Sequence, residues 1–134
     1  MSEHDSQVAF FRWAAHQGIP GLDQIHAIPN GGFRHPSVAA KLKAEGVKSG
    51  VPDVYWPLAR GAFIGLAIEF KYADAGPSKE QRERITRLQN DGWCVCVCWD
   101  WRAAARTVQG YAGMMTISMP CQFEDSEKSM VEEY

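Results

Sequence analysis

A chain of 134 residues is the size of one domain and is long enough to bury a core without disulfide or metal crosslinks. Its composition, 46% hydrophobic and 22% charged, is typical of a soluble globular protein, and no apolar run of about 18 residues predicts a membrane span. The polar, acidic start MSEHDSQ is unlike a signal peptide, so we expect a cytoplasmic protein.

The net charge of −2 is unevenly distributed along the chain. Residues 114–134 contain five acidic residues and one lysine, which leaves 13 Lys and Arg against 11 Asp and Glu in residues 1–113, a balance of +2. This distribution permits DNA binding without indicating it. We treat residues 1–113 as the domain and residues 114–134 as an acidic extension, which we expect to pack on the domain or on a partner chain.

The first part of the chain predicts two helices and one short strand. Apolar residues recur at helical spacing over residues 6–17, and Gly18 and Pro20 follow directly. Residues 24–29 alternate weakly and predict a short strand before the turn at Asn30-Gly31-Gly32. A second helix is predicted over residues 36–45, with Gly46 just past its end.

The second part predicts three strands and two helices. Residues 51–56 and 64–72 read as consecutive strands, and residues 78–91 as a helix in which Ser78 and Gln81 have capping-box spacing. Residues 93–99 are apolar on both faces and predict a central strand, followed by a helix over residues 102–114. The order indicates a single α/β domain with a small mixed sheet.

The four cysteines do not show the paired spacing of a zinc site. Cys94, Cys96 and Cys98 alternate along one predicted strand, so their side chains share one face, and Cys121 lies far along the chain. We therefore expect free buried thiols.

A carboxylate and an ammonium group leave the predicted strand 64–72 on the same face. Glu69 and Lys71 are two residues apart, and Asp53 lies at the entry to the preceding strand, where a hairpin can bring it next to Glu69. Two adjacent carboxylates repel each other unless a cation intervenes, and hard oxygen ligands suit a divalent ion. Such an ion can activate water for attack on a phosphate, and Lys71 can orient that water.

A simpler interpretation remains open for these three residues. Glu69 and Lys71 could form a solvent-facing pair on an edge strand, and Asp53 could be a turn residue after Pro52. However, Pro52-Asp53 followed by Glu69-Phe70-Lys71 matches the PD-(D/E)XK nuclease pattern.

An ordered series of motifs resembles the VRR-NUC family, the virus-type replication-repair nucleases of phages and bacteria with relatives in eukaryotic DNA repair. The resemblance covers roughly residues 3–113. It rests on Asn30-Gly31-Gly32, Gly46-Val47-Lys48, Gly50-Val51-Pro52-Asp53, Ile68-Glu69-Phe70-Lys71 and Gln81. It implies a restriction-endonuclease-like α/β fold and a protein from a bacterial cell, encoded by the host or by a phage.

The resemblance also implies the components of an active site. Asp53, Glu69 and the backbone carbonyl of Phe70 would bind Mg²⁺ or Mn²⁺, without an organic cofactor, and Lys71 would position water. Glu3 would lean into the site, although Asp5 lies close enough to substitute and the helix dipole alone would favour an acid there. Gln81 would be an active-site glutamine, a capping-box partner of Ser78, or both.

The resemblance further implies a homodimer that cuts branched DNA such as four-way junctions. Candidate DNA contacts combine a glycine-rich turn with basic side chains, which suit phosphate groups; they are Asn30, Gly31, Arg34, Lys41, Lys48, Lys79, Arg82 and Arg87. A solvated helix face explains the arginines equally well. Met114, Met115 and Met119 are candidate interface residues, although a role in the core explains them equally well.

Three rival functions remain. The first is a nuclease for flaps or single strands, and the second is a non-catalytic DNA-binding module with a degenerate site, which the intact Asp53, Glu69 and Lys71 set disfavours. The third, a glycosidase, is disfavoured because Lys71 would lower the raised pKa that a general acid needs.

Overall fold

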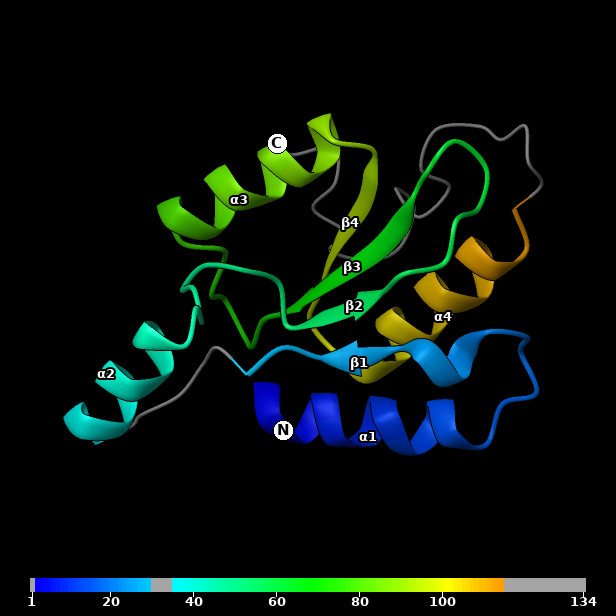
Figure 1. Cartoon of the computed structure of the whole chain (residues 1–134). Coiled ribbons are helices and arrows are strands. Elements are labelled where there is room, and N and C mark those ends of the chain that lie inside the picture. Colours follow the sequence, from blue (N-terminus) through cyan, green and yellow to red (C-terminus); the bar gives the residue numbers. More distant parts are fainter. Residues whose placement is uncertain (1, 30–34, 115–134) are drawn as a thin grey trace.

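The computed structural model describes residues 2–29 and 35–114, which form a four-stranded sheet with helices on both faces (Figure 1). In chain order the elements are α1 (Glu3–Ala15), the 3-10 helix η1 (Leu22–Gln24), β1 (His26–Ala27), α2 (Pro36–Ala44), β2 (Val54–Trp56), β3 (Gly65–Phe70), α3 (Lys79–Asn90), β4 (Trp93–Cys98) and α4 (Trp101–Ala112). The expected α/β class is confirmed. No helix in these residues is long and apolar enough to cross a membrane.

The sheet is mixed, as the sequence predicts. Its strand order is β1-β2-β3-β4; β2 runs antiparallel to both β1 and β3, whereas β4 runs parallel to β3. A parallel pair needs a long crossover, and α3 supplies it between β3 and β4. This connection returns the chain so that the C-terminal ends of β3 and β4 lie at the same end of the sheet as the start of β2.

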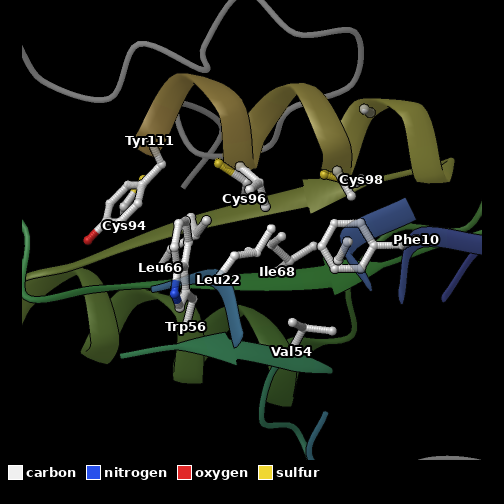
Figure 2. Packing of buried hydrophobic residues seen from close by; sticks show 14 of the residues in the cluster. Phe10, Leu22, Val54, Trp56, Leu66, Ile68, Cys94, Cys96, Cys98 and Tyr111 are labelled. Carbon is white, nitrogen blue, oxygen red and sulfur yellow. The ribbon is translucent and has the colours of Figure 1, made fainter. Parts of the chain in front are cut away.

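Alternation along the strands divides the buried residues between two cores. Leu66, Ile68 and Phe70 of β3 lie in the main core with the three cysteines of β4, on the face covered by α1 and α4 (Figure 2). Ala67 of β3 lies on the opposite face with Val95, Val97 and Ile85 of α3. Cys94, Cys96 and Cys98 are free and buried, as expected; Cys121 lies outside the described residues.

The prediction that residues 93–99 form a central strand is wrong. Among the described strands β4 lies at the end of the sheet, next to β3 alone. It is apolar on both faces because helices cover both: α3 packs on one and α4 on the other. Two-sided helix packing therefore produces the same sequence pattern as a central position.

Several element ends differ from the predicted ones. α1 begins at Glu3 rather than at residue 6 because Ser2 and Asp5 form a capping box. β2 begins only at Val54, so the Gly50 to Asp53 segment is irregular. Residues 22–24 form η1, which leaves only His26 and Ala27 for the first strand.

The helix α2 stands apart from both cores. None of its residues is buried, and Figure 1 shows it beyond the end of the sheet where β2 begins. A nine-residue helix gains little stability by itself in water. Its basic side chains, Lys41 and Lys43, are therefore exposed to solvent.

The described residues end at the start of the acidic extension. Met114 is buried in the main core, which favours its core role over an interface role. Residues 115–134 lie outside the described residues, as do residues 30–34, where the sequence predicts the Asn30-Gly31-Gly32 turn. The expected packing of the extension stays a prediction.

Candidate active site

Asp53 and Glu69 meet where β2 begins and β3 ends. The antiparallel register pairs Val54 with Ile68, so the next pair outward places Asp53 opposite Glu69. Opposite residues of an antiparallel pair project from the same face with Cβ atoms about 4.5–5.5 Å apart. The structure thus brings together two acidic residues that are 16 positions apart in the sequence.

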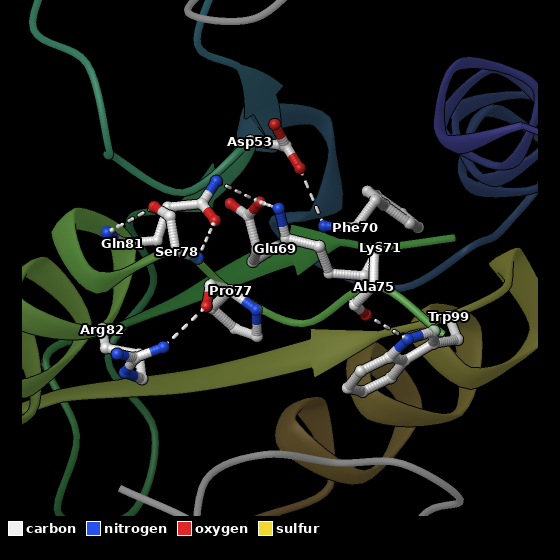
Figure 3. Close-up of polar contacts among 10 residues, drawn as sticks. All are labelled: Asp53, Glu69, Phe70, Lys71, Ala75, Pro77, Ser78, Gln81, Arg82 and Trp99. Carbon is white, nitrogen blue, oxygen red and sulfur yellow. Dashed lines mark hydrogen bonds and ion pairs between the residues drawn. The ribbon is translucent and has the colours of Figure 1, made fainter. Parts of the chain in front are cut away.

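Backbone hydrogen bonds hold Asp53 on both sides. Its Oδ2 accepts a hydrogen bond of 2.7 Å from the backbone N–H of Phe70 (Figure 3). Its backbone carbonyl accepts one of 2.8 Å from the Ile28 N–H. These contacts fix the carboxylate against the end of β3 although Asp53 itself lies outside the regular strand.

Two donors approach the same oxygen of Glu69. Nε2 of Gln81 donates a hydrogen bond of 2.9 Å to Oε2, and Nζ of Lys71 lies 3.4 Å from that atom (Figure 3). The Glu69 residue is 2% exposed. Lys71 is therefore the partner of a buried carboxylate, so the alternative of a solvent-facing edge pair does not hold.

Each carboxylate keeps one oxygen without a hydrogen-bond partner among residues 2–29 and 35–114. These atoms are Oδ1 of Asp53 and Oε1 of Glu69. The Phe70 carbonyl oxygen lies on the same side as these two atoms. The Lys71 N–H donates a hydrogen bond to Cys98 of β4, and in the trans peptide between Phe70 and Lys71 the carbonyl points in the opposite direction to that N–H. It therefore projects toward β2 and Asp53.

Burial raises the pKa of both carboxyl groups. The pKa of Glu69 rises from 4.5 to about 8, first because of desolvation and then because of the Asp53 charge, while Lys71 acts in the opposite direction. Desolvation likewise raises the pKa of Asp53 from 3.8 to about 6, against the hydrogen bond from Phe70. The Lys71 charge therefore does not fully offset the cost of burying two ionised carboxylates side by side.

The available oxygen atoms fit a hard divalent cation. Two carboxylate oxygens and one carbonyl are the ligand types that Mg²⁺ and Mn²⁺ prefer, and a cation would stabilise both ionised carboxylates. Within the described residues no group of three His, Cys, Asp or Glu side chains could hold a metal by itself. Asp53, Glu69 and the Phe70 carbonyl would therefore need water to complete the coordination.

Glu3 and Asp5 have different surroundings. The Asp5 side chain accepts hydrogen bonds from the N–H and Oγ of Ser2, at 3.0 and 2.9 Å, so it is used in capping α1. The charge of Glu3, by contrast, raises the pKa of both Asp53 and Glu69. Between the two, Glu3 is the one that acts on the site, although it is exposed and its ligation of a metal remains a prediction.

The two expected contacts of Gln81 occur together. It is the N3 residue of the α3 capping box with Ser78, and its amide nitrogen still reaches Glu69. Capping and contact with the site are therefore compatible.

The basic candidates for DNA contacts lie in different places. Lys79 and Arg82 are exposed in the first turns of α3, near Gln81, whereas Arg87 is farther along that helix. Lys79 lies 3.8 Å from Glu83. Lys41 and Lys48 are exposed on α2 and just after it. Asn30, Gly31 and Arg34 lie outside the described residues.

The segment between Lys71 and α3 is held by two contacts that the sequence does not reveal. Nε1 of Trp99 donates a hydrogen bond of 2.9 Å to the Ala75 carbonyl, and a guanidinium nitrogen of Arg82 donates one of 2.9 Å to Pro77 (Figure 3). Arg82 thus has a structural contact besides its predicted DNA role. No local pattern predicts either contact, because both depend on how the segment folds back.

Comparison with known proteins identifies the family. No model of a known sequence family matches the chain, and no curated protein matches it. A solved structure described as a VRR_NUC domain protein is 32% identical, over 89% of this chain and 97% of that chain, with a TM-score of 0.74. The identity and the shared fold agree with the motifs at Asp53, Glu69 and Lys71. The chain therefore belongs to the VRR-NUC family.

Proposed function

We propose that this protein is a metal-dependent DNA endonuclease that hydrolyses phosphodiester bonds. Its membership of a nuclease family supports a nuclease-type activity. The observation that carries the proposal is the pairing of Asp53 and Glu69, each with one oxygen engaged by the protein and one turned to no protein donor among the described residues. Lys71 lies beside this pair.

Asp53, Glu69 and the Phe70 carbonyl would hold Mg²⁺ or Mn²⁺. When bound, such an ion would polarise the scissile phosphate and offset its charge. The hydrogen bonds from Phe70 to Asp53 and from Gln81 to Glu69 would hold both carboxylates in position for the ion. Preformed ligands reduce the reorganisation required for binding.

Lys71 would act on the attacking water and on the developing negative charge. Its Nζ lies 3.4 Å from Glu69, and the side chain is 12% exposed, so the ammonium is held at the edge of the site. A preorganised cation in a partly water-excluded position stabilises transition-state charge more than a mobile surface lysine does.

Exposed basic side chains around the site would position the DNA backbone. Lys79 and Arg82 begin α3 beside Gln81, and Lys41 and Lys48 belong to the separate α2 region at the same end of the sheet. Contacts of this type position DNA without reading its sequence.

We further propose branched DNA as the substrate and a homodimer as the active form. A two-fold dimer presents two equivalent sites, which matches the two-fold symmetry of a four-way junction. A single domain of 15.0 kDa offers little surface for such a substrate.

Cleavage of a DNA panel tests this proposal. Four-way junctions, flaps, single strands and linear duplexes would be incubated with Mg²⁺ or Mn²⁺, with Asp53→Asn as the inactive control. The expected result is metal-dependent cutting that is fastest on junctions and absent in the variant. Cutting of flaps alone would contradict the substrate, and no cutting of any DNA, or equal cutting by Asp53→Asn, would contradict the nuclease site.

A further inference from the structure

A continuous chain of hydrogen bonds joins the start of α3 to the site. Oγ of Ser78 accepts a bond of 3.1 Å from the Gln81 backbone, and the Ser78 N–H donates one of 2.8 Å to Oε1 of Gln81. Nε2 of Gln81 then donates the 2.9 Å bond to Oε2 of Glu69 (Figure 3). The N-cap residue is thus one side chain away from a buried carboxylate.

The Ser78 N–H decides which end of the Gln81 amide faces Glu69. A glutamine amide can present either its oxygen or its NH₂ group to a neighbour, and a flip exchanges the two. Because a backbone N–H can only donate, it takes Oε1 and leaves NH₂ for Glu69. The flipped amide would bring two oxygens together at Glu69 and two N–H groups together at Ser78.

The capping box of α1 provides a comparison within the same chain. There the N3 residue is Asp5, an exposed acid whose contacts are with Ser2, its own N-cap residue. An acid therefore satisfies a cap by itself. Gln81 differs because it offers both an acceptor for the cap and a donor for Glu69, a combination that no carboxylate supplies.

We propose that Ser78 is a positioning residue of the active site: its N-cap hydrogen bonds hold the Gln81 amide nitrogen toward Oε2 of Glu69, which leaves Oε1 of Glu69 for a divalent cation. This inference rests on the proposed nuclease function. The Gln81 amide nitrogen and the Lys71 ammonium both contact Oε2 of Glu69. These two donors therefore set the orientation of the Glu69 carboxylate.

Three substitutions at Ser78 separate its two hydrogen bonds. Ser78→Pro removes the N–H and the hydroxyl, and the φ of −68° already suits proline. Ser78→Gly removes only the hydroxyl, and Ser78→Thr keeps both groups. We expect kcat to fall by about 10- to 100-fold in Ser78→Pro, as for loss of other groups that orient a metal ligand, with KM for DNA little changed. The fall in kcat should be smaller in Ser78→Gly, and Ser78→Thr should keep the wild-type rate.

A double-mutant cycle distinguishes positioning from general helix stability. If Ser78 acts through Gln81, Ser78→Pro should lower kcat no further in a Gln81→Ala background. Asp100→Ala is the matched control, because Asp100 caps α4 by accepting a bond of 2.8 Å from Ala103. It should destabilise the fold without the selective loss of kcat. Additive losses, or an equal loss of kcat in Asp100→Ala, would overturn the proposal.

Nuclear magnetic resonance and calcium binding provide readouts that do not depend on cleavage. In the metal-free protein the Gln81 NH₂ protons should exchange slowly with water in the wild type and Ser78→Thr and faster in Ser78→Pro. Calcium affinity, measured by calorimetry, should fall in the same variant. Unchanged exchange and affinity would overturn the positioning role. If the wild type cuts no DNA, the proposed function fails, but these two readouts still decide the role of Ser78. Should Ser78→Pro not fold, Ser78→Ala against Ser78→Thr tests the hydroxyl bond to the Gln81 backbone alone, and equal rates, NH₂ exchange and calcium affinity in these two variants would overturn the role of the cap.

Discussion

The hydrogen bonds of Glu69 distinguish its two oxygens. Oε2 accepts from Gln81 and faces Lys71, whereas Oε1 has no hydrogen-bond donor in the described parts of the chain. In the same way Oδ2 of Asp53 accepts a hydrogen bond from the Phe70 N–H, whereas Oδ1 has no donor in the described parts of the chain. The motif alone predicts which residues meet, but not which oxygen is engaged, because that depends on the contact between α3 and β3.

The charge of Lys71 should be needed for the reaction rate and not for the fold. Lys71→Ala should lower the cleavage rate on the order of 10²-fold or more, because a preorganised charge is lost from the transition state. Lys71→Arg should restore little activity, since a planar guanidinium does not replace a compact ammonium. Single-turnover cleavage measures the rate and circular dichroism checks the fold. A wild-type rate in Lys71→Ala would show that the assigned role is wrong.

The stability of the metal-free protein should fall as the pH rises. The folded pKa values of Asp53 and Glu69, about 6 and about 8, lie above their usual values of 3.8 and 4.5. The folded state thus binds more protons than the unfolded chain between about pH 4 and pH 8, and deprotonation in this window disfavours folding. Thermal unfolding in EDTA should show a lower melting temperature at pH 8 than at pH 5.

Glu69→Gln is the control for this pH dependence, because glutamine does not titrate. The variant should show a much smaller loss of stability between pH 5 and pH 8. The same slope in both proteins would mean that Glu69 does not hold its proton as described.

At the scale of elements, periodicity and capping signals predict most of the helices and strands but not their surroundings. The Ser78 and Gln81 spacing correctly predicts the cap of α3, and Pro36 correctly marks the start of α2. The position of β4 is not predictable in this way, because an apolar strand looks the same whether strands flank it or helices cover it. The early start of α1 depends on a Ser2 and Asp5 box with an aspartate in place of the usual glutamate or glutamine.

The absence of a side chain at Gly65 of β3 makes room for the ring of Trp93, its partner on β4. A Cβ atom built on Gly65 would overlap the Trp93 ring, so Gly65→Ala must displace that ring. Overpacking of this type costs about 1–3 kcal/mol. Urea unfolding should show this loss in the free energy of unfolding.

Gly18→Ala is the matched control for Gly65→Ala. A Cβ atom at Gly18 meets no atom within 4 Å, and its φ is not positive. The free energy of unfolding should therefore stay the same or rise slightly. Equal effects of the two substitutions would contradict the packing of Trp93 on Gly65.

At the scale of the whole molecule, we expect the free protein to be a dimer and its affinity for DNA to depend on salt. Light scattering of the free protein should give a dimer at micromolar concentration. Junction affinity should fall steeply with salt, because phosphate contacts release counterions. A monomer that prefers flaps to junctions would contradict the dimeric form and leave the chemistry of the site intact.

Lys48→Gln and Lys41→Gln test whether the separate α2 region contacts DNA. Both lysines are exposed. Lys41 belongs to α2, which Figure 1 shows beyond the end of the sheet where β2 begins, and Lys48 lies between α2 and β2 in the sequence. The plot of log affinity against log salt has a negative slope, and each substitution should reduce the magnitude of that slope by about 1. The preference among DNA structures should not change. Unchanged slopes would exclude phosphate contacts by these two lysines.

Direct binding of Mn²⁺ tests the central claim, that Asp53 and Glu69 share one divalent ion. Calorimetric titration at pH 8 should detect a Mn²⁺ site in the wild type that is lost in Asp53→Asn and in Glu69→Gln. Asp23→Asn, at an exposed acid in η1, should bind as the wild type does. Undiminished Mn²⁺ binding in both Asp53→Asn and Glu69→Gln would contradict the shared site.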